Sequence, residues 1–179
     1  MANKKRPPES STDTSRPQEQ DYYEGDRLAR LLKLIHEGIE SAKDKNSLPE
    51  KFWFKQQFSI GVNEVTRALE RMLPTADKGG SSAQLRKPAT VHLQAILIAH
   101  DSNPKWLTKH LPSLASTRKV PVIFVKDKKG GSLRLGELVR LKTAIAVGIK
   151  AKGNSINQIV EEILRGDNET EHLHCTDEM

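Results

Sequence analysis

The residues best suited to chemistry lie in the segment 61–67, which reads Gly-Val-Asn-Glu-Val-Thr-Arg. Its glycine permits close approach of another backbone, and a helix that begins just after it presents free N–H groups and the positive end of its dipole. Asn63 can donate and accept hydrogen bonds, Glu64 only accepts, and Arg67 donates a planar fork. Together these groups could bind base edges and a phosphate. The same spacing fits ordinary helix capping by Asn63, and spacing alone favours this simpler alternative slightly.

Charge is divided unevenly along the 179 residues, whose net charge is +6. Residues 1–47 hold nine basic and nine acidic side chains, residues 48–165 hold 20 basic and nine acidic ones, and residues 166–179 hold five acidic and no basic ones. A strongly basic domain is therefore followed by an acidic tail. Dense positive charge is typical of nucleic-acid binders, and the alternative is a solvated surface that keeps the protein soluble.

Composition argues against several other classes of protein. Cys175 is the single cysteine, so an intramolecular disulfide is impossible and a cysteine-based zinc site is not expected. No apolar run approaches the roughly 20 residues that a membrane helix needs, and the charged start of the chain has no apolar stretch behind it, unlike a secretory signal. His172, His174 and Cys175 lie in the acidic tail, where we expect no metal site. We therefore expect a soluble, intracellular protein without metal, cofactor, small-molecule substrate or membrane partner.

The start of the chain is expected to form a tail and one helix. Residues 1–21 are rich in Pro, Ser, Thr, Gln and charge, which predicts disorder. Within them, Lys4-Lys5-Arg6-Pro7 could be a nuclear import signal. Leu and Ile recur at helical spacing after Asp26, which predicts a helix that Asp26 caps and that ends within 43–47.

The candidate segment itself is expected to lie at the start of a helix. Residues 49–58 contain half of the aromatic side chains and predict a short helix or turn, followed by a brief strand at 58–60. Residues 62–73 predict an amphipathic helix with Asn63 as its N-cap. Residues 74–90 contain Pro, Gly and Ser and predict a long loop.

The rest of the basic domain alternates strands with helices. Continuous apolar runs predict buried strands at 93–99, 120–125 and 143–149. This alternation predicts an α/β fold, a three-layer α/β/α sandwich around a mixed central sheet. The expected helices span 104–118 and 133–139, with a last one from the cap Asn154 to a stop at Gly166. The expected organisation is a tail (1–21), an N-terminal helix (22–47), a basic domain (48–165) and an acidic tail (166–179).

Five motifs follow one another in the basic domain. They are Gly61-Val-Asn-Glu-Val-Thr-Arg-Ala-Leu-Glu-Arg71, Ile96-Leu-Ile-Ala-His-Asp-Ser-Asn-Pro104, His110-Leu-Pro112, Val120-Pro121 and Leu135-Gly136. In sequence and order they resemble the kink-turn-binding ribosomal-protein family of the L-seven-Ae type, over residues 58–164. Within that family, Val62, Arg67 and the tracts 116–121 and 141–150 are most similar to the thirty-eight-kilodalton-type subunits of ribonuclease P/MRP.

The resemblance implies a noncatalytic RNA-binding sandwich. In the family, the residues that match Asn63, Glu64 and Arg67 bind the sheared G·A pairs of a kink-turn, an RNA element of the distorted kind that proteins recognise. The loop that matches Leu138-Val139-Arg140-Leu141 packs against an extruded nucleotide. His100 stands where most relatives have Glu, so we expect it to change RNA affinity or its pH dependence. The expected RNA-binding residues, basic phosphate contacts included, are Gly61, Asn63, Glu64, Arg67, Arg71, His100, Lys126, Lys128, Lys129, Arg134, Leu138, Val139, Arg140 and Lys142.

The sequence therefore predicts a noncatalytic subunit of nuclear ribonuclease P/MRP that holds a bent RNA element during precursor tRNA and rRNA processing. Its expected partners are structured RNA and other ribonucleoprotein subunits, and its expected place is the nucleus and nucleolus. Two alternatives remain open. One is a kink-turn scaffold of a snoRNP or the ribosome, and the other is a protein–protein adaptor on the same fold.

Overall fold

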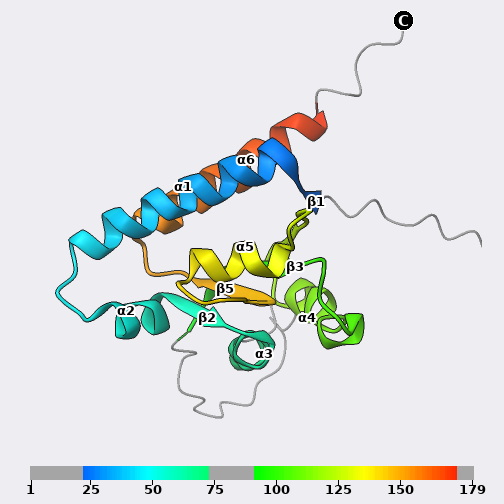
Figure 1. Ribbon diagram of the computed structural model, residues 1–179, viewed down its shortest axis with the longest axis horizontal. Coiled ribbons are helices and arrows are strands. Elements are labelled where there is room, and N and C mark those ends of the chain that lie inside the picture. The colour runs from blue at the N-terminus through cyan, green and yellow to red at the C-terminus, as the bar shows by residue number, and fades with distance from the viewer. Residues whose placement is uncertain (1–21, 73–90, 173–179) are drawn as a thin grey trace, which may run out of the picture.

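A computed structural model describes residues 22–72 and 91–172 of the chain (Figure 1). The predicted tail at 1–21, the predicted loop at 74–90 and the tail residues His174 and Cys175 lie outside the described residues. The centre of the fold is a mixed five-stranded sheet in the order β1-β4-β3-β5-β2. Strands β1, β3 and β4 are parallel, whereas β5 runs antiparallel to both β3 and β2. The strands are β1 (Tyr22–Tyr23), β2 (Phe58–Ile60), β3 (Leu93–Ala99), β4 (Val122–Val125) and β5 (Ala146–Lys150).

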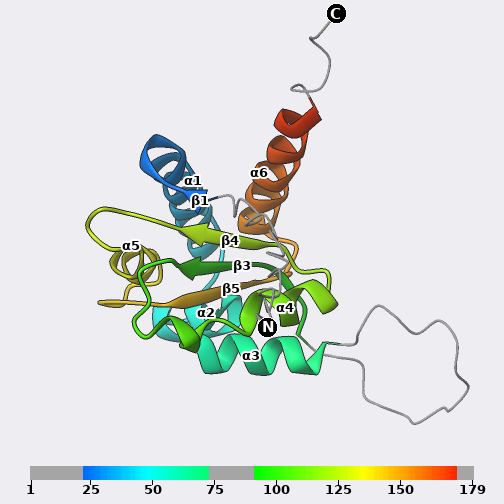
Figure 2. The same cartoon turned by 90° about the vertical axis from the view of Figure 1, so that its right-hand side faces the viewer.

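Helices cover both faces of this sheet, which confirms the predicted three-layer sandwich. Figure 2 shows α1 and α6 on one side of the sheet and α3 and α4 on the other. The side chains of α2 and α5 join the core on the α1 side. The helices are α1 (Gly25–Asp44), α2 (Glu50–Gln57), α3 (Val62–Arg71), α4 (Leu111–Thr117), α5 (Gly131–Leu138) and α6 (Ser155–His172), with a 3-10 turn at Lys105–Leu107.

The apolar run of β3 explains why the sheet lies between two cores. Successive side chains of a strand point to opposite faces, so Leu97 contributes to the core under α1 and α6, whereas Ile96 and Ile98 contribute to the core under α3 and α4. Burial on both faces requires an unbroken apolar strand, which is the pattern that the sequence shows here.

Helix α1 is part of this sandwich, because its apolar stripe packs on the same core as α6. Leu28, Leu31 and Ile35 are buried in that core. At Gly38 the two helices approach so closely that an added Cβ would lie 2.9 Å from Ile159 Cδ1. Because Gly38 has no side chain, α1 and α6 can pack this closely.

Two predicted N-caps and one predicted helix are wrong, each for a local reason. Neither Asp26 nor Asn63 is an N-cap: α1 begins at Gly25, and α3 begins at Val62 directly after Gly61, whose φ of 96° turns the chain out of β2. The predicted helix 104–118 is instead a 3-10 turn and the separate helix α4. Pro112 accounts for the break, since a proline lacks the N–H donor and crowds the carbonyl four residues earlier.

The start of α6 is as predicted, but its end is not. The Oδ1 atom of Asn154 accepts hydrogen bonds from the N–H groups of Ile156 and Asn157, at 3.1 and 3.3 Å, which confirms the predicted cap. Gly166 lacks the positive φ of a glycine that ends a helix. The helix therefore continues to His172, and the first residues of the expected acidic tail are helical.

Candidate nucleic-acid interface

The first turn of α3 is the starting point of the candidate site. The Gly61 N–H donates to the Ala146 carbonyl at 2.8 Å, which fixes the start of α3 beside β5. Val65 and Leu69 are buried, so the helix turns Asn63 and Arg67 to solvent. Glu64 and Arg67 form an exposed ion pair at 3.3 Å. The three polar side chains predicted to bind RNA are thus exposed at one helix start.

An open groove of about 880 Å³ lies beside this helix start. Glu64 borders it from α3, and residues 139–141 border it after α5, so two of the segments expected at an RNA site meet here. The remaining lining comes from α2, β2 and β5. The lining residues are Glu50, Lys51, Phe54, Lys55, Phe58, Ser59, Ile60, Glu64, Val139, Arg140, Leu141 and Lys150.

Lys150 borders the groove and contributes a basic group to it. Its Nζ atom donates to the Lys55 carbonyl at 2.9 Å. Burial lowers the pKa of Lys150, the neighbouring charge of Lys152 lowers it further, and Glu64 opposes both effects. The groove thus combines four basic with two acidic side chains.

The loop after α5 differs from its sequence-based description. Leu138 and Val139, predicted to contact RNA, are buried in the core on the α1 side, and their side chains are 5% and 3% exposed. Leu141, the last residue of that predicted loop, is 49% exposed and borders the groove. Arg140 between them has a φ of 59°, which is rare for a residue with a side chain. That turn of the backbone separates the buried pair from the exposed leucine.

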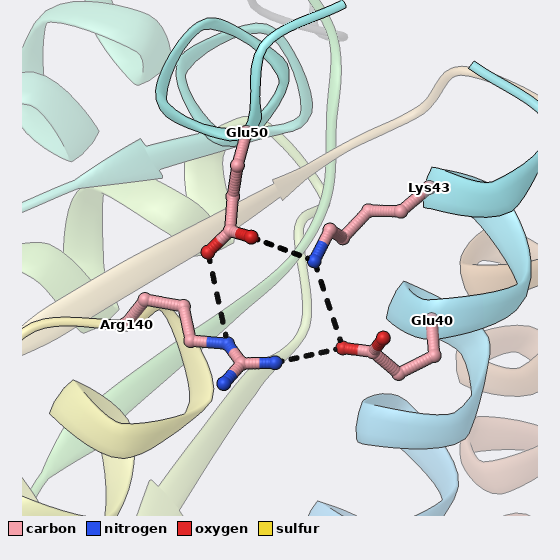
Figure 3. Close-up of polar contacts among 4 residues, drawn as sticks. All are labelled: Glu40, Lys43, Glu50 and Arg140. Carbon is pink, nitrogen blue, oxygen red and sulfur yellow. Dashed lines mark hydrogen bonds and ion pairs between the residues drawn. The ribbon is translucent and has the colours of Figure 1, made fainter. Parts of the chain in front are cut away.

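Arg140 is held by a network of four charges from three parts of the chain (Figure 3). Its Nη2 atom donates to Glu40 at 2.9 Å, and its Nε atom lies 3.9 Å from Glu50. Lys43 lies 2.9 Å from Glu50 and 3.8 Å from Glu40. The network joins the end of α1, the start of α2 and the loop after α5.

The titration of Glu50 tests this network. The hydrogen bond from Lys43 holds the pKa of Glu50 below its usual value, desolvation opposes this, and the charges of Lys43 and Arg140 lower it further. A carboxyl group with a lowered pKa stabilises the folded state above its unfolded pKa, and that stabilisation is lost as pH falls through the lower, folded value. We expect Lys43→Met to move the Glu50 midpoint up towards its usual value, as measured by NMR of the side-chain carboxyl carbon. Lys33→Met, a matched change elsewhere on α1, should leave that midpoint unchanged, and an unmoved midpoint in Lys43→Met would contradict the network.

The other basic residues expected at the site lie away from the groove, most of them after β4. Lys126 lies 3.6 Å from Glu24, and Arg134 lies 3.1 Å from Asp127 and 3.5 Å from Glu137, so both have acidic partners. Lys128 and Lys129 are exposed in the turn before α5. Lys142 is exposed after the loop, and Arg71 is exposed at the far end of α3. None of these residues lines the groove.

His100 and Asp101 lie where β3 ends, and both have structural partners. The His100 ring packs edge-on against Tyr22, with ring centroids 4.8 Å apart. The Asp101 carboxylate accepts hydrogen bonds from the N–H and the hydroxyl of Ser132, each at 2.9 Å, and so caps the start of α5. Asp101 therefore positions α5, and His100 packs beneath the first strand.

Across residues 22–72 and 91–172, no helix is long and apolar enough to cross a membrane. Over the same ranges, His, Cys, Asp and Glu side chains nowhere gather in a group of three that could hold a metal ion.

The fold and the groove define the class of the chain: it is an α/β/α sandwich domain with a ligand-sized groove at a helix start. Residues 84–159 match the model of the Ribosomal protein L7Ae/L30e/S12e/Gadd45 family. The matched range includes the loop after α5 but not the segment 61–67.

Two curated relatives are similar in sequence to part of the chain. The chain is 33% identical over 94 residues to large ribosomal subunit protein eL8 of Caenorhabditis elegans, covering 50% of the chain and 34% of that protein. It is 33% identical over 129 residues to eL8 of Drosophila melanogaster, covering 72% of the chain and 38% of that protein. The chain thus spans little more than a third of these relatives.

A solved structure supports the fold independently. The 15.5kD RNA binding protein of Giardia lamblia superposes with a TM-score of 0.52 at 19% sequence identity, covering 79% of this chain and 88% of that one. At 19% identity, this likeness shows a shared fold and carries no conclusion about function.

Proposed function

We propose that the chain binds structured RNA in the groove at the start of α3, and that it does so as a noncatalytic subunit of nuclear ribonuclease P/MRP. The observation that carries the proposal is that Glu64 and the loop residues 139–141 line one groove although they are far apart in sequence. The net positive charge of residues 48–165 and the exposure of Asn63 and Arg67 support it. The RNA would carry the chemistry, and the protein would hold a kink-turn-like element during precursor tRNA and rRNA processing.

The ribonuclease P/MRP assignment rests on the resemblance of Val62, Arg67 and the tracts 116–121 and 141–150 to that group of subunits. It implies a place in the nucleus, with the nucleolus as the expected compartment. A ribosomal or snoRNP scaffold is the second candidate, which the similarity to two eL8 proteins favours.

Binding of two RNAs tests the general proposal. The full chain is titrated with a kink-turn RNA and with a straight duplex of the same base composition, at several salt concentrations. We expect tighter binding of the kink-turn, with an affinity that falls as salt rises. Equal affinity for both RNAs would reduce the interaction to general attraction between charges and would contradict the proposed site.

The RNA recovered with the tagged chain from cells tests the finer assignment. Enrichment of the RNA subunits of ribonuclease P and MRP is the expected result. Enrichment of ribosomal or small nucleolar RNA would favour the second candidate. Recovery of no RNA, together with salt-insensitive protein partners, would favour an adaptor.

A further inference from the structure

We infer that Glu40, Lys43 and Glu50, from α1 and α2, hold Arg140 as a positioning residue. Arg140 thereby fixes the loop wall of the groove, which is residues 139–141, and does not itself contact the RNA. The inference rests on the proposed function for its effect on RNA, and it replaces the expectation that Arg140 contacts a phosphate. It concerns a role for α1, a helix that precedes the residues matching the family model.

The first argument is geometric. The guanidinium of Arg140 is a planar fork with fixed donor directions, and two carboxylates from different helices engage it, Glu40 through Nη2 and Glu50 near Nε. Lys43 contacts the same two carboxylates, so that each charge of the network has two partners of opposite sign (Figure 3). A closed square of this kind fixes the orientation of the side chain better than one exposed ion pair, which contributes little.

The second argument is the backbone at Arg140. A φ of 59° is unfavourable for a residue with a Cβ and persists only where the surroundings hold it. The Arg140 N–H donates to the backbone carbonyl of Glu137 at 3.3 Å, and the Leu141 N–H donates to the backbone carbonyl of Gly136 at 2.8 Å. The backbone is thus anchored to α5 and the side chain to α1 and α2, and between them they set the place of exposed Leu141 at the groove.

The third argument is electrostatic. The two positive and two negative charges of the network cancel one another, so this corner attracts a phosphate weakly. A phosphate that approached Arg140 would also approach Glu40 and Glu50, and it would compete with the 2.9 Å contact between Arg140 and Glu40. Basic groups without such acidic neighbours, such as exposed Lys142, are better placed to contact phosphate.

The decisive experiment removes the two carboxylates and leaves Arg140 in place. If Arg140 positions the loop, Glu40→Gln with Glu50→Gln should weaken the binding of kink-turn RNA by about 5-fold, because the loop loses its anchors. If Arg140 contacts phosphate, the same change should tighten binding, because it frees the arginine and removes negative charge. Glu161→Gln with Glu162→Gln on α6 is the matched control, with the same change in net charge, and should leave the affinity equal or slightly higher. Tighter binding in the network variant than in this control would overturn the inference.

Two changes at Arg140 itself provide a second readout. Arg140→Gln should weaken binding by a similar factor while keeping the slope of log affinity against log salt, whereas loss of a phosphate contact would reduce that slope by about 0.7–0.9. Arg140→Gly adopts the same φ without strain but lacks the ion pairs, so it should bind as weakly as Arg140→Gln. Full affinity in Arg140→Gly would mean that the backbone alone sets the loop, and would contradict the inference.

Amide hydrogen exchange in the protein without RNA separates this inference from the proposed function. The Leu141 amide should exchange several-fold faster in the Glu40→Gln, Glu50→Gln variant than in the wild type or the α6 control. If no form of the protein binds RNA but Leu141 exchange rises as expected, the proposed function fails and the positioning role stands. If exchange at Leu141 is unchanged, the positioning role fails whatever the measured RNA affinities are.

Discussion

Replacing Asn63 and Arg67 together by alanine should lower the affinity for kink-turn RNA by about 100-fold while the fold stays intact. Hydrogen bonds to charged groups or base edges contribute about 1–3 kcal/mol each, and the loss of two such contacts gives this factor. Both side chains are exposed on the side of α3 opposite buried Val65 and Leu69, so the core loses nothing. Affinity is measured by titration, and the fold by thermal unfolding.

A matched change on the other side of the sheet separates the site from general charge. Lys33→Ala also removes one positive charge, but from α1, which covers the opposite face from α3 (Figure 2). We expect it to lower RNA affinity less than 2-fold, the size of a distant charge effect at moderate salt. Equal losses from Lys33→Ala and from the α3 double variant would show that the RNA does not lie at α3.

Those parts of the fold that depend on local periodicity could be predicted from the sequence. The run 93–99 is apolar at every position but one, and it forms β3 with both faces buried. The stripe that includes Val65 and Leu69 likewise predicted α3, because the side that a helix buries follows from a repeat of 3.6 residues. Such patterns are read within one element and need no knowledge of its neighbours.

What the sequence did not reveal depends on contacts between distant segments. Strand β1 has two residues, too few for any periodicity, and exists because Tyr22 and Tyr23 pair with β4. Arg140 and Glu40 are 100 residues apart, and nothing in either local sequence indicates that they meet. The composition of the loop also hid its geometry: Leu138, Val139 and Leu141 look alike in sequence, and only the backbone turn at Arg140 separates the buried pair from the exposed residue.

Of the site residues predicted from the sequence, Glu64, Val139 and Arg140 line the groove. Motif order placed residues 61–67 and 138–141 in one site, and Glu64 with residues 139–141 does line one groove. The basic residues after β4 were assigned from charge alone. They lie outside the groove lining, and Lys126 and Arg134 also pair with neighbouring acids. Charge in a sequence thus indicates a kind of partner, whereas the ion pairs of the fold decide which charges remain available to it.

Gly136→Ala should destabilise the folded chain by about 2–3 kcal/mol and weaken RNA binding as well. A Cβ at this position would lie 2.6 Å from Thr143 Cα and 2.8 Å from the Lys142 carbonyl carbon, and these backbone atoms cannot turn aside as a side chain can. Overpacking of this kind costs about 1–3 kcal/mol. The Gly136 carbonyl also accepts the 2.8 Å hydrogen bond from Leu141 that anchors the loop wall, so the same displacement should distort the groove. Denaturant unfolding measures the first effect and RNA titration the second.

Gly166→Ala is the matched control for this prediction, because it makes the same chemical change in another helix. Nothing lies within 4 Å of the added Cβ at Gly166, and its φ is not positive. Alanine favours the helix over glycine by about 1 kcal/mol, so this variant should be as stable as the wild type or slightly more so, with unchanged RNA affinity. A destabilised Gly166→Ala would mean that α6 ends at this glycine after all. An unaffected Gly136→Ala would mean that the segment 142–143 moves freely, and a wall that moves so easily could not hold a bent RNA in place.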